Sequence, residues 1–269
     1  MSILTLASFG TSPGVTTTAV AMTMSWPRPV LLVEADVAKP SAVLSGWLQG
    51  SLPADSGLMG VAQSSFQRVV SEQDIWDYAV ELAPRQDDVP ARWLLPAIAQ
   101  PRAARGMRSL WPDLLAALRL ISAQDVDVII DAGRAEEAYG RDPLWSDSDH
   151  LAVLLRSDLT SVAALRPYLP SLAQARMERG AADTTSLVVI EDRAQKLPSK
   201  DISTVLDAPV RGRLPYSPEA AAHFGGGAGS QARTRAYTLA VSALNAAVGD
   251  ALRTRQELIR KDQSTEETR

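Results

Sequence analysis

The 269-residue sequence contains no cysteine and only two histidines, His150 and His223. Without cysteine the chain has no disulfide framework and no thiolate metal site, which fits a reducing cytosol. The two histidines lie far apart in the sequence, and this argues against a histidine-based metal site and against a Ser/His/Asp triad.

The chain also has no long apolar run, no basic stretch before its first apolar run and no excess of positive charge. No segment approaches about 20 uninterrupted apolar residues, and no basic stretch precedes the first apolar run, so we expect neither a membrane-spanning helix nor a secretory leader. The formal net charge of −4 gives no support for wholesale binding to nucleic acid or anionic lipid. A hydrophobic content of 46% is ample for a buried core.

Short apolar runs rich in β-branched residues alternate with longer helical patterns. The runs predict strands at 3–7, 30–33, 93–95, 126–130, 151–155, 187–190 and 210–214. The helical patterns cover 16–25, 105–121, 160–179 and 230–260, and Pro167 and Pro170 interrupt the third. This alternation predicts an α/β fold: a doubly wound, mostly parallel sheet of about seven strands with helices on both faces. We expect a single domain over residues 1–260 and a polar tail over 261–269.

Residues 4–19 carry the most informative pattern, a strand followed by a glycine-containing loop and a helix start. Gly10 and Gly14 permit close approach of a ligand to the backbone, and a helix N-terminus attracts anions. The helix start adds the hydroxyls of Thr16, Thr17 and Thr18. These features predict a phosphate-binding loop at the end of the first strand.

A defining residue of such a loop is nevertheless missing. A P-loop reads G-x-x-x-x-G-K-[ST], and its lysine reaches the β- and γ-phosphates. Here Val15 and Thr16 stand where Gly-Lys is expected, and no lysine precedes Lys39. The alternative is a plain strand–turn–helix connection with Ser12 or Thr16 as the N-cap.

Two later strands end in carboxylates. The apolar run at 30–33 is followed by Glu34 and Asp36, two residues apart and therefore expected on one side of the strand end. Asp36 is a candidate for holding a Mg²⁺-bound water or positioning an attacking water; the alternative is a solvated turn acid. The run at 127–130 ends in Asp131, as in a Walker B element, whose Asp contacts Mg²⁺.

Taken together and in this order, the three segments resemble the MinD/ParA family of deviant P-loop ATPases over residues 2–250. The family loop reads K-G-G-V-G-K-T-T. A gapless match places Thr11 at its signature lysine and Thr16 at its second lysine, and a gapped match, which pairs 13–15 with G-G-V, moves these by one residue. Neither match leaves a lysine in the loop. The loss of the lysines resembles that in the TadZ (CpaE-like) members, some of which have degenerate loops. The S-P-G-V-T-T-T sequence is most similar to loops of actinobacterial ParA-like proteins.

The resemblance implies a site for ATP or ADP with Mg²⁺. The residues implied to hold the nucleotide are Gly10, Thr11, Ser12, Pro13, Gly14, Val15, Thr16, Thr17, Thr18, Arg193 and Pro215. Thr17, Asp36 and Asp131 are the implied metal ligands, and Asp36 is also the implied catalytic residue. The last two nucleotide contacts come from 187–193 and 205–216, which resemble the late strand and the base-binding segment of the family. Where the family has Asn-Arg after the late strand, this chain has Glu191-Asp192-Arg193.

The resemblance also implies a function in positioning cellular machinery. Because phosphoryl transfer depends on positive charge at the phosphates, a loop without lysine predicts weak or absent ATP hydrolysis. We therefore expect a localisation or scaffold factor for a pilus, secretion or partition system. One alternative is an active ATPase whose missing lysine is supplied by Arg134 or by a partner subunit. Another is a partition protein that binds DNA non-specifically through Arg102, Arg105 and Arg108.

The expected partners follow from the same resemblance. They are protein partners of a pilus, secretion or partition complex, and a second copy of the chain in a nucleotide-sandwich homodimer. We expect a cytoplasmic protein that is recruited to the membrane or the cell pole. The apolar stripe of the helix at 230–260 is explained by docking on the sheet, and the alternative is peripheral membrane contact through the end of this helix.

Overall fold

The computed structural model describes most of the chain. The described residues are 2–37, 41–46, 57–83, 85, 88–97, 106–136, 139–181, 184–192, 196–226 and 230–266.

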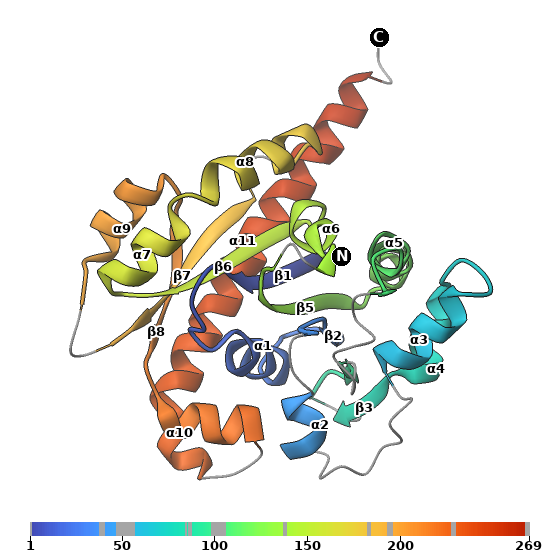
Figure 1. Ribbon diagram of the computed structural model, residues 1–269, viewed down its shortest axis with the longest axis horizontal. Coiled ribbons are helices and arrows are strands. Elements are labelled where there is room, and N and C mark those ends of the chain that lie inside the picture. The colour runs from blue at the N-terminus through green and yellow to red at the C-terminus, as the bar shows by residue number, and fades with distance from the viewer. Residues whose placement is uncertain are drawn as a thin grey trace.

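Eight strands form one sheet in the order β3-β4-β2-β5-β1-β6-β7-β8 (Figure 1). The strands are β1 (Ile3–Ser8), β2 (Val30–Glu34), β3 (Val80–Ala83), β4 (Arg92–Leu95), β5 (Asp127–Arg134), β6 (His150–Arg156), β7 (Thr185–Glu191) and β8 (Val210–Pro215). All neighbouring pairs are parallel except β3 with β4. The predicted doubly wound, mostly parallel sheet is confirmed. The one strand that the sequence did not predict is β3, a short and only partly buried edge strand without a continuous apolar run.

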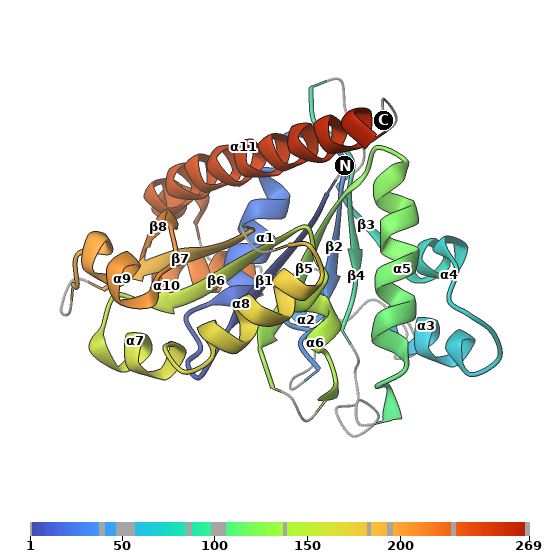
Figure 2. The same cartoon turned by 90° about the horizontal axis from the view of Figure 1, so that it is seen from above.

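Helices cover both faces of the sheet (Figure 2). One face packs against α3 (Leu58–Ser65), α4 (Glu72–Tyr78), α5 (Leu110–Ala123), α6 (Asp142–Ser146), α7 (Leu159–Leu165), α8 (Leu169–Glu178) and α9 (Ser199–Leu206). The other packs against α1 (Val15–Met24), α2 (Ala42–Gly46), α10 (Pro218–Ala220), η3 (Ala221–Gly225) and α11 (Arg235–Glu266), which the short η4 (Gln231–Thr234) precedes. Since both faces are covered, the central strands are apolar on both sides, as the continuous runs predicted.

The predicted helices form, with shifted ends. The helix predicted at 105–121 begins only at Leu110. The one predicted at 160–179 is divided into α7 and α8 near Pro167, as the prolines indicated. The last helix continues to Glu266, through most of the segment expected to be a polar tail.

Helix α11 docks along the sheet through its apolar stripe. The buried side chains of this stripe are Tyr237, Val241, Leu244, Val248 and Leu252, and they belong to the same core cluster as α1. Docking therefore accounts for the stripe. Among the described residues, no helix is both long and apolar enough to cross a membrane.

Strand order places three strand ends beside one another. β1 lies between β5 and β6, and β5 lies between β1 and β2. The chain leaves β1 toward one side of the sheet and later crosses back to its other side, so β1 sits at the point where the winding direction changes. In open parallel sheets, ligands bind at the carboxyl ends of strands at such a point.

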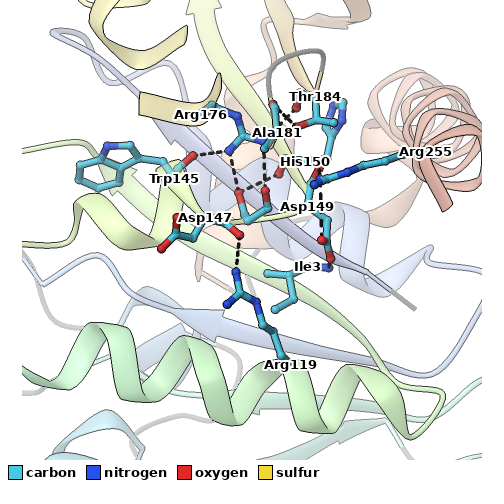
Figure 3. A network of polar contacts seen from close by, with 11 residues as sticks. Ile3, Arg119, Trp145, Asp147, Asp149, His150, Arg176, Ala181, Thr184 and Arg255 are labelled. Atoms are coloured by element: carbon cyan, nitrogen blue, oxygen red, sulfur yellow. Dashed lines mark hydrogen bonds and ion pairs between the residues drawn. The ribbon is translucent and has the colours of Figure 1, made fainter. Parts of the chain in front are cut away.

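The opposite edge of the sheet is closed by a network of polar contacts (Figure 3). The Arg176 side chain, from α8, is fully buried and donates hydrogen bonds to the backbone oxygens of Trp145 and Ser148. Arg255, from α11, donates to the backbone oxygen of Asp149. These contacts tie α8 and α11 to the segment that enters β6.

His150 lies within this network at the start of β6. Its Nε2 is 2.8 Å from the Ser186 hydroxyl, and the ring is 2% exposed. Burial, together with the positive charges of Arg211, Arg176 and Arg255, lowers the pKa of His150 to about 3. The imidazole is therefore neutral at physiological pH and acts as a structural hydrogen-bonding group.

Candidate functional site

The loop after β1 turns sharply into α1 at two glycines in the left-handed region. Gly10 has φ 86° and Gly14 has φ 99°, and Gly14 is the N-cap of α1. A Cβ atom at Gly10 would lie 2.9 Å from Cβ of Ala164, so both the backbone angle and the space favour glycine. The Ser8 hydroxyl donates to the backbone oxygen of Thr11 (2.8 Å), which closes the loop on the strand. This geometry presents the first turn of α1 to the carboxyl edge of the sheet.

A cavity of about 360 Å³ opens at this edge, between the loop and the ends of β2 and β5. It is lined by Ser8, Ser12, Gly14, Val15, Thr16, Thr17, Asp36, Gly133, Arg134 and Glu136. The cavity therefore joins the three segments singled out in the sequence, although about 120 residues separate the first from the third.

Asp36 lines this cavity and is held against the end of β5. A Cβ atom at Gly133 would lie only 2.3 Å from Cγ of Asp36. Gly133 also has φ 57°, so glycine is required there both for backbone conformation and for close approach. Asp36 is 7% exposed and faces the loop threonines across the cavity. This placement is compatible with its predicted role next to a Mg²⁺-bound water.

Asp131 and Glu34 have different surroundings from Asp36. Asp131 is 1% exposed, its Oδ1 accepts the backbone N–H of Gly133 (2.9 Å), and it is not among the residues that line the cavity. Glu34 accepts hydrogen bonds from the Ser41 hydroxyl and the Ala97 backbone N–H. Burial, with a contribution from the nearby Asp131 carboxylate, raises the pKa of Glu34 to about 7. Glu34 therefore links the end of β2 to α2 and to the end of β4, while Asp36 faces the cavity.

A buried guanidinium, which the sequence analysis did not identify, supports the site from below. Arg141 is fully buried and donates to the backbone oxygens of Ala35 (2.6 Å), Ala132 (2.7 Å) and Arg134 (2.7 Å). Burial lowers the pKa of Arg141. The negative charge of Asp36 makes the largest contribution in the opposite direction and raises this pKa. Arg141 thus joins the ends of β2 and β5 and brings positive charge close to Asp36. No local pattern marks an arginine seven residues after the end of β5 as a site residue.

Among the described residues that line the cavity, Arg134 is the only one with a positively charged side chain. Its Nη2 donates to the Ser12 hydroxyl (3.0 Å), so the side chain reaches from the end of β5 to the tip of the loop. Residues 8–24 of the loop and α1 contain no lysine or arginine. The positive charge at this cavity therefore comes from the end of β5, whereas in an ordinary P-loop it comes from the lysine of the loop.

The remaining predicted loop contacts are distributed around the cavity. Thr16 and Thr17 both line it, so either match to the family loop keeps a hydroxyl there. Thr18 points elsewhere, because its hydroxyl is 3.0 Å from the Gly14 oxygen and 2.9 Å from the Tyr237 hydroxyl. Thr11 lines, with Ser12, a neighbouring hollow of about 510 Å³. The predicted contacts Gly10 and Pro13 shape the loop without lining the cavity.

The predicted base-binding region lies further along the same sheet edge. Pro215 and Tyr216 line a hollow of about 500 Å³ with Asp192, which also lines the hollow beside Thr11. The guanidinium of Arg156 lies over the Tyr216 ring at 4.9 Å. Arg193, the other predicted contact, lies outside the described residues. A continuous row of hollows therefore follows the carboxyl edge from the loop to β8.

A larger hollow elsewhere on the molecule does not have these features. It has a volume of about 570 Å³ and is lined mainly by apolar residues of α8 and α9, among them Leu169, Leu172 and Leu206. Size alone does not identify a binding site, and converging polar groups carry more weight. The cavity beside the loop is therefore the better candidate.

The donor set of the cavity fits a nucleotide with Mg²⁺. The start of α1 supplies backbone N–H groups and a positive dipole end for phosphate, and the two threonine hydroxyls and Asp36 supply oxygen ligands. Mg²⁺ is usually held by only one or two carboxylates with several waters. In the part of the chain that the structure describes, no three His, Cys, Asp or Glu side chains are grouped to hold a metal ion.

The structure describes only one of the three arginines on which the DNA-binding alternative depends. Arg102 and Arg105 lie outside the described residues. Arg108 is exposed and precedes α5.

Comparison with solved structures identifies the fold. The chain is similar to a McdA variant from Cyanothece in complex with ATP (TM-score 0.66, 18% identity, covering 94% of this chain and 96% of that one). It is also similar to MinD from Pyrococcus horikoshii OT3 in complex with Mg-ADP (TM-score 0.62, 13% identity, 91% and 94% covered) and to a ParA family ATPase from Chlorobium tepidum (TM-score 0.59, 14% identity, 92% and 98% covered). No protein-family model and no curated protein matches the sequence. The fold is that of the MinD and ParA P-loop ATPases.

Proposed function

We propose that this protein is a MinD/ParA-like, nucleotide-dependent positioning factor whose phosphate loop has lost its lysines. It binds Mg-ATP or Mg-ADP in the cavity beside Gly14 and hydrolyses ATP slowly or not at all. Like the degenerate TadZ and actinobacterial ParA-like proteins, it serves as a localisation or scaffold factor for a pilus, secretion or partition system. The observation that carries the proposal is the cavity that joins the loop, Asp36 and the end of β5 at the switch point of the sheet.

Nucleotide binding is supported by groups that do not depend on lysine. The left-handed Gly14 aims the first turn of α1 at the cavity, Thr16 and Thr17 offer hydroxyls there, and Asp36 lies opposite. Slow hydrolysis is supported by charge, since the described cavity lining contains one cation, Arg134, beside two carboxylates, Asp36 and Glu136. Positive charge on the transferring phosphoryl group is the main means of catalysis in this chemistry, and one well-placed cation is worth about 10³–10⁵-fold in rate.

A binding measurement tests the nucleotide part of the proposal. Titration calorimetry with Mg-ATP and Mg-ADP should give dissociation constants on the order of micromolar, and turnover should stay well below about 1 s⁻¹, the lower end for kinases. Absence of binding would contradict the proposal, and turnover at the ordinary rate of a lysine-containing ATPase would contradict the slow-hydrolysis part.

A lysine added back to the loop provides a second test. The two matches to the family loop place the second lysine at Thr16 or one residue later, so Thr16→Lys and Thr17→Lys are both needed. One of them should tighten Mg-ATP binding by about tenfold or more, the worth of one charge-assisted contact in a site that excludes water. Thr16→Met and Thr17→Met are controls of similar length without charge. If neither lysine variant differs from its methionine control, the pocket does not hold phosphate in the manner of a P-loop.

The positioning role needs a separate test in cells. A fluorescent fusion in the source organism should gather at a discrete position at the membrane or the cell pole. In-cell crosslinking should then recover components of a pilus, secretion or partition apparatus. A uniform distribution, with crosslinks only to unrelated proteins, would contradict the scaffold role and leave nucleotide binding unaffected.

A further inference from the structure

We propose that Arg134 is the phosphate-binding cation of this site and replaces, from the end of β5, the charge that the loop lacks. The inference rests on the proposed nucleotide binding and names the residue through which the polyphosphate is recognised. It assigns a ligand contact to the end of β5, outside the phosphate loop.

The first argument is position. The Arg134 side chain leaves the end of β5, crosses the cavity and reaches the tip of the loop, where its Nη2 lies 3.0 Å from the Ser12 hydroxyl. It lines the same cavity as Thr16 and Thr17. A phosphate held at the start of α1 therefore lies within reach of a guanidinium that is already directed at the loop.

The second argument is preorganisation of the backbone that carries this side chain. The Arg134 oxygen accepts a hydrogen bond from the buried Arg141 (2.7 Å), and Ser8 pairs with Arg134 across the β1–β5 register. The next residue, Ala135, donates its N–H to the Ser8 oxygen (2.8 Å). The backbone is thus fixed on both sides while the side chain is exposed. Because the backbone is fixed and the guanidinium is already held toward the loop by Ser12, less conformational entropy is lost when a ligand binds.

The third argument is charge. The other charged side chains of the cavity lining are Asp36 and Glu136, so without Arg134 the described lining has only negative charge and repels a polyphosphate. In the structure Arg134 donates to a neutral hydroxyl. Hydrogen bonds between ionised partners are roughly twice as strong as neutral ones, and guanidinium groups match phosphate with two parallel bonds. A phosphate oxygen therefore displaces Ser12 as the acceptor.

Four variants separate this role from a structural one. Arg134→Ala removes the cation. Arg134→Lys keeps the charge but not the planar guanidinium that forms two parallel hydrogen bonds. Ser12→Ala removes the contact seen in the structure and leaves the cation free. Arg119→Ala is the matched control, because Arg119 donates to the backbone oxygen of Asp147 at the opposite edge of the sheet (Figure 3). Circular dichroism and thermal unfolding verify that each variant folds, and Arg134→Gln replaces Arg134→Ala if the latter does not.

The readout is the dissociation constant for Mg-ATP, Mg-ADP and AMP, measured by calorimetry at one salt concentration. Arg134→Ala should weaken Mg-ATP binding by about tenfold or more and AMP binding by less than about threefold, because the cation contacts the terminal phosphates. Arg134→Lys should recover part of the loss. Ser12→Ala should weaken Mg-ATP binding by clearly less than Arg134→Ala does, and Arg119→Ala should stay within about threefold of the wild type.

Three outcomes would overturn the inference. One is Mg-ATP affinity of Arg134→Ala equal to that of the wild type, which leaves nucleotide binding intact. Another is an equal loss in Ser12→Ala and Arg134→Ala, which shows that the contact only shapes the loop. The third is a wild-type protein that binds none of the three nucleotides, which removes the nucleotide part of the proposed function together with the inference.

Discussion

The pH dependence of stability between pH 5 and pH 7 is expected to be the balance of two buried groups with opposite shifts. The pKa of Glu34 is raised from 4.5 to about 7 by burial, and the pKa of His150 is lowered from 6.5 to about 3, also by burial. Among the described residues with shifted pKa values, Asp74 and Glu191 are shifted downward, below this window, and the pKa of Tyr237 is raised to about 12, above it. Among the described residues, Glu34 and His150 are the two whose shifted pKa values affect proton binding inside the window.

The signs follow from proton binding. Between pH 7 and pH 5 folded Glu34 holds more proton than the unfolded chain, so its contribution to the free energy of unfolding rises as the pH falls. His150 binds less proton in the folded protein than in the unfolded chain, so its contribution to the free energy of unfolding decreases as the pH falls. Integrated over these two pH units with the pKa values above, each effect amounts to about 2 kcal/mol. The two cancel, and the wild type should show an almost flat profile.

Single variants should expose the two opposed slopes. His150→Gln, which keeps a hydrogen-bonding group toward Ser186, should become about 2 kcal/mol more stable at pH 5 than at pH 7. Glu34→Gln should become less stable at pH 5 by a similar amount, and the double variant should again be flat. The free energy of unfolding is measured in urea at pH 5, 6 and 7. For each variant its change with pH is taken relative to the value of the same variant at pH 7. Identical slopes in the wild type and His150→Gln would refute the reasoning.

Two further predictions concern the support of the site. Arg141→Leu removes three hydrogen bonds to buried carbonyl oxygens and should lower the free energy of unfolding by about 3–5 kcal/mol, while Arg141→Lys should lose less; equal stability of Arg141→Leu and the wild type in urea unfolding would contradict this. Gly133→Ala should lower stability by about 1–3 kcal/mol and weaken Mg-ATP binding, because the new methyl group meets Asp36 at 2.3 Å and the backbone has φ 57°. Gly106→Ala, where no atom lies within 4 Å of the new Cβ, is the matched control and should behave as the wild type in both assays.

The fold was predictable because its signal is local. Strands buried on both faces read as continuous apolar runs, and each of the predicted runs forms a strand of the sheet. Helix α11 follows from its apolar stripe, and helix α1 follows from its place between the loop and Pro27. The edge strand β3 escaped prediction, because an edge strand in contact with solvent has neither the continuous run nor the length that marks a central one.

The site was predictable in part. The loop, Asp36 and the end of β5 were expected to meet because the carboxyl ends of neighbouring parallel strands share one edge, and the cavity joins them. The expectation that Glu34 and Asp36 lie on one side of the strand end did not anticipate their separate surroundings. β2 ends at Glu34, and the contacts of Glu34 come from Ser41 and from Ala97, which follows the end of β4.

The sequence by itself determined the layered α/β architecture, the phosphate-loop position and the absence of a lysine from that loop, since each depends on residues adjacent in the chain. The tertiary structure alone decided which charges serve the site. Arg134 reaches Ser12 across 122 positions, and Arg141 reaches Ala35 across 106. Such contacts depend on strand order and on the direction of a single side chain, and neither leaves a periodic or local trace in the sequence. For this reason the missing loop lysine can be read from the sequence. Arg134 could be named from the sequence only as one alternative source of charge, and its place at the cavity follows from the neighbouring positions of β1 and β5.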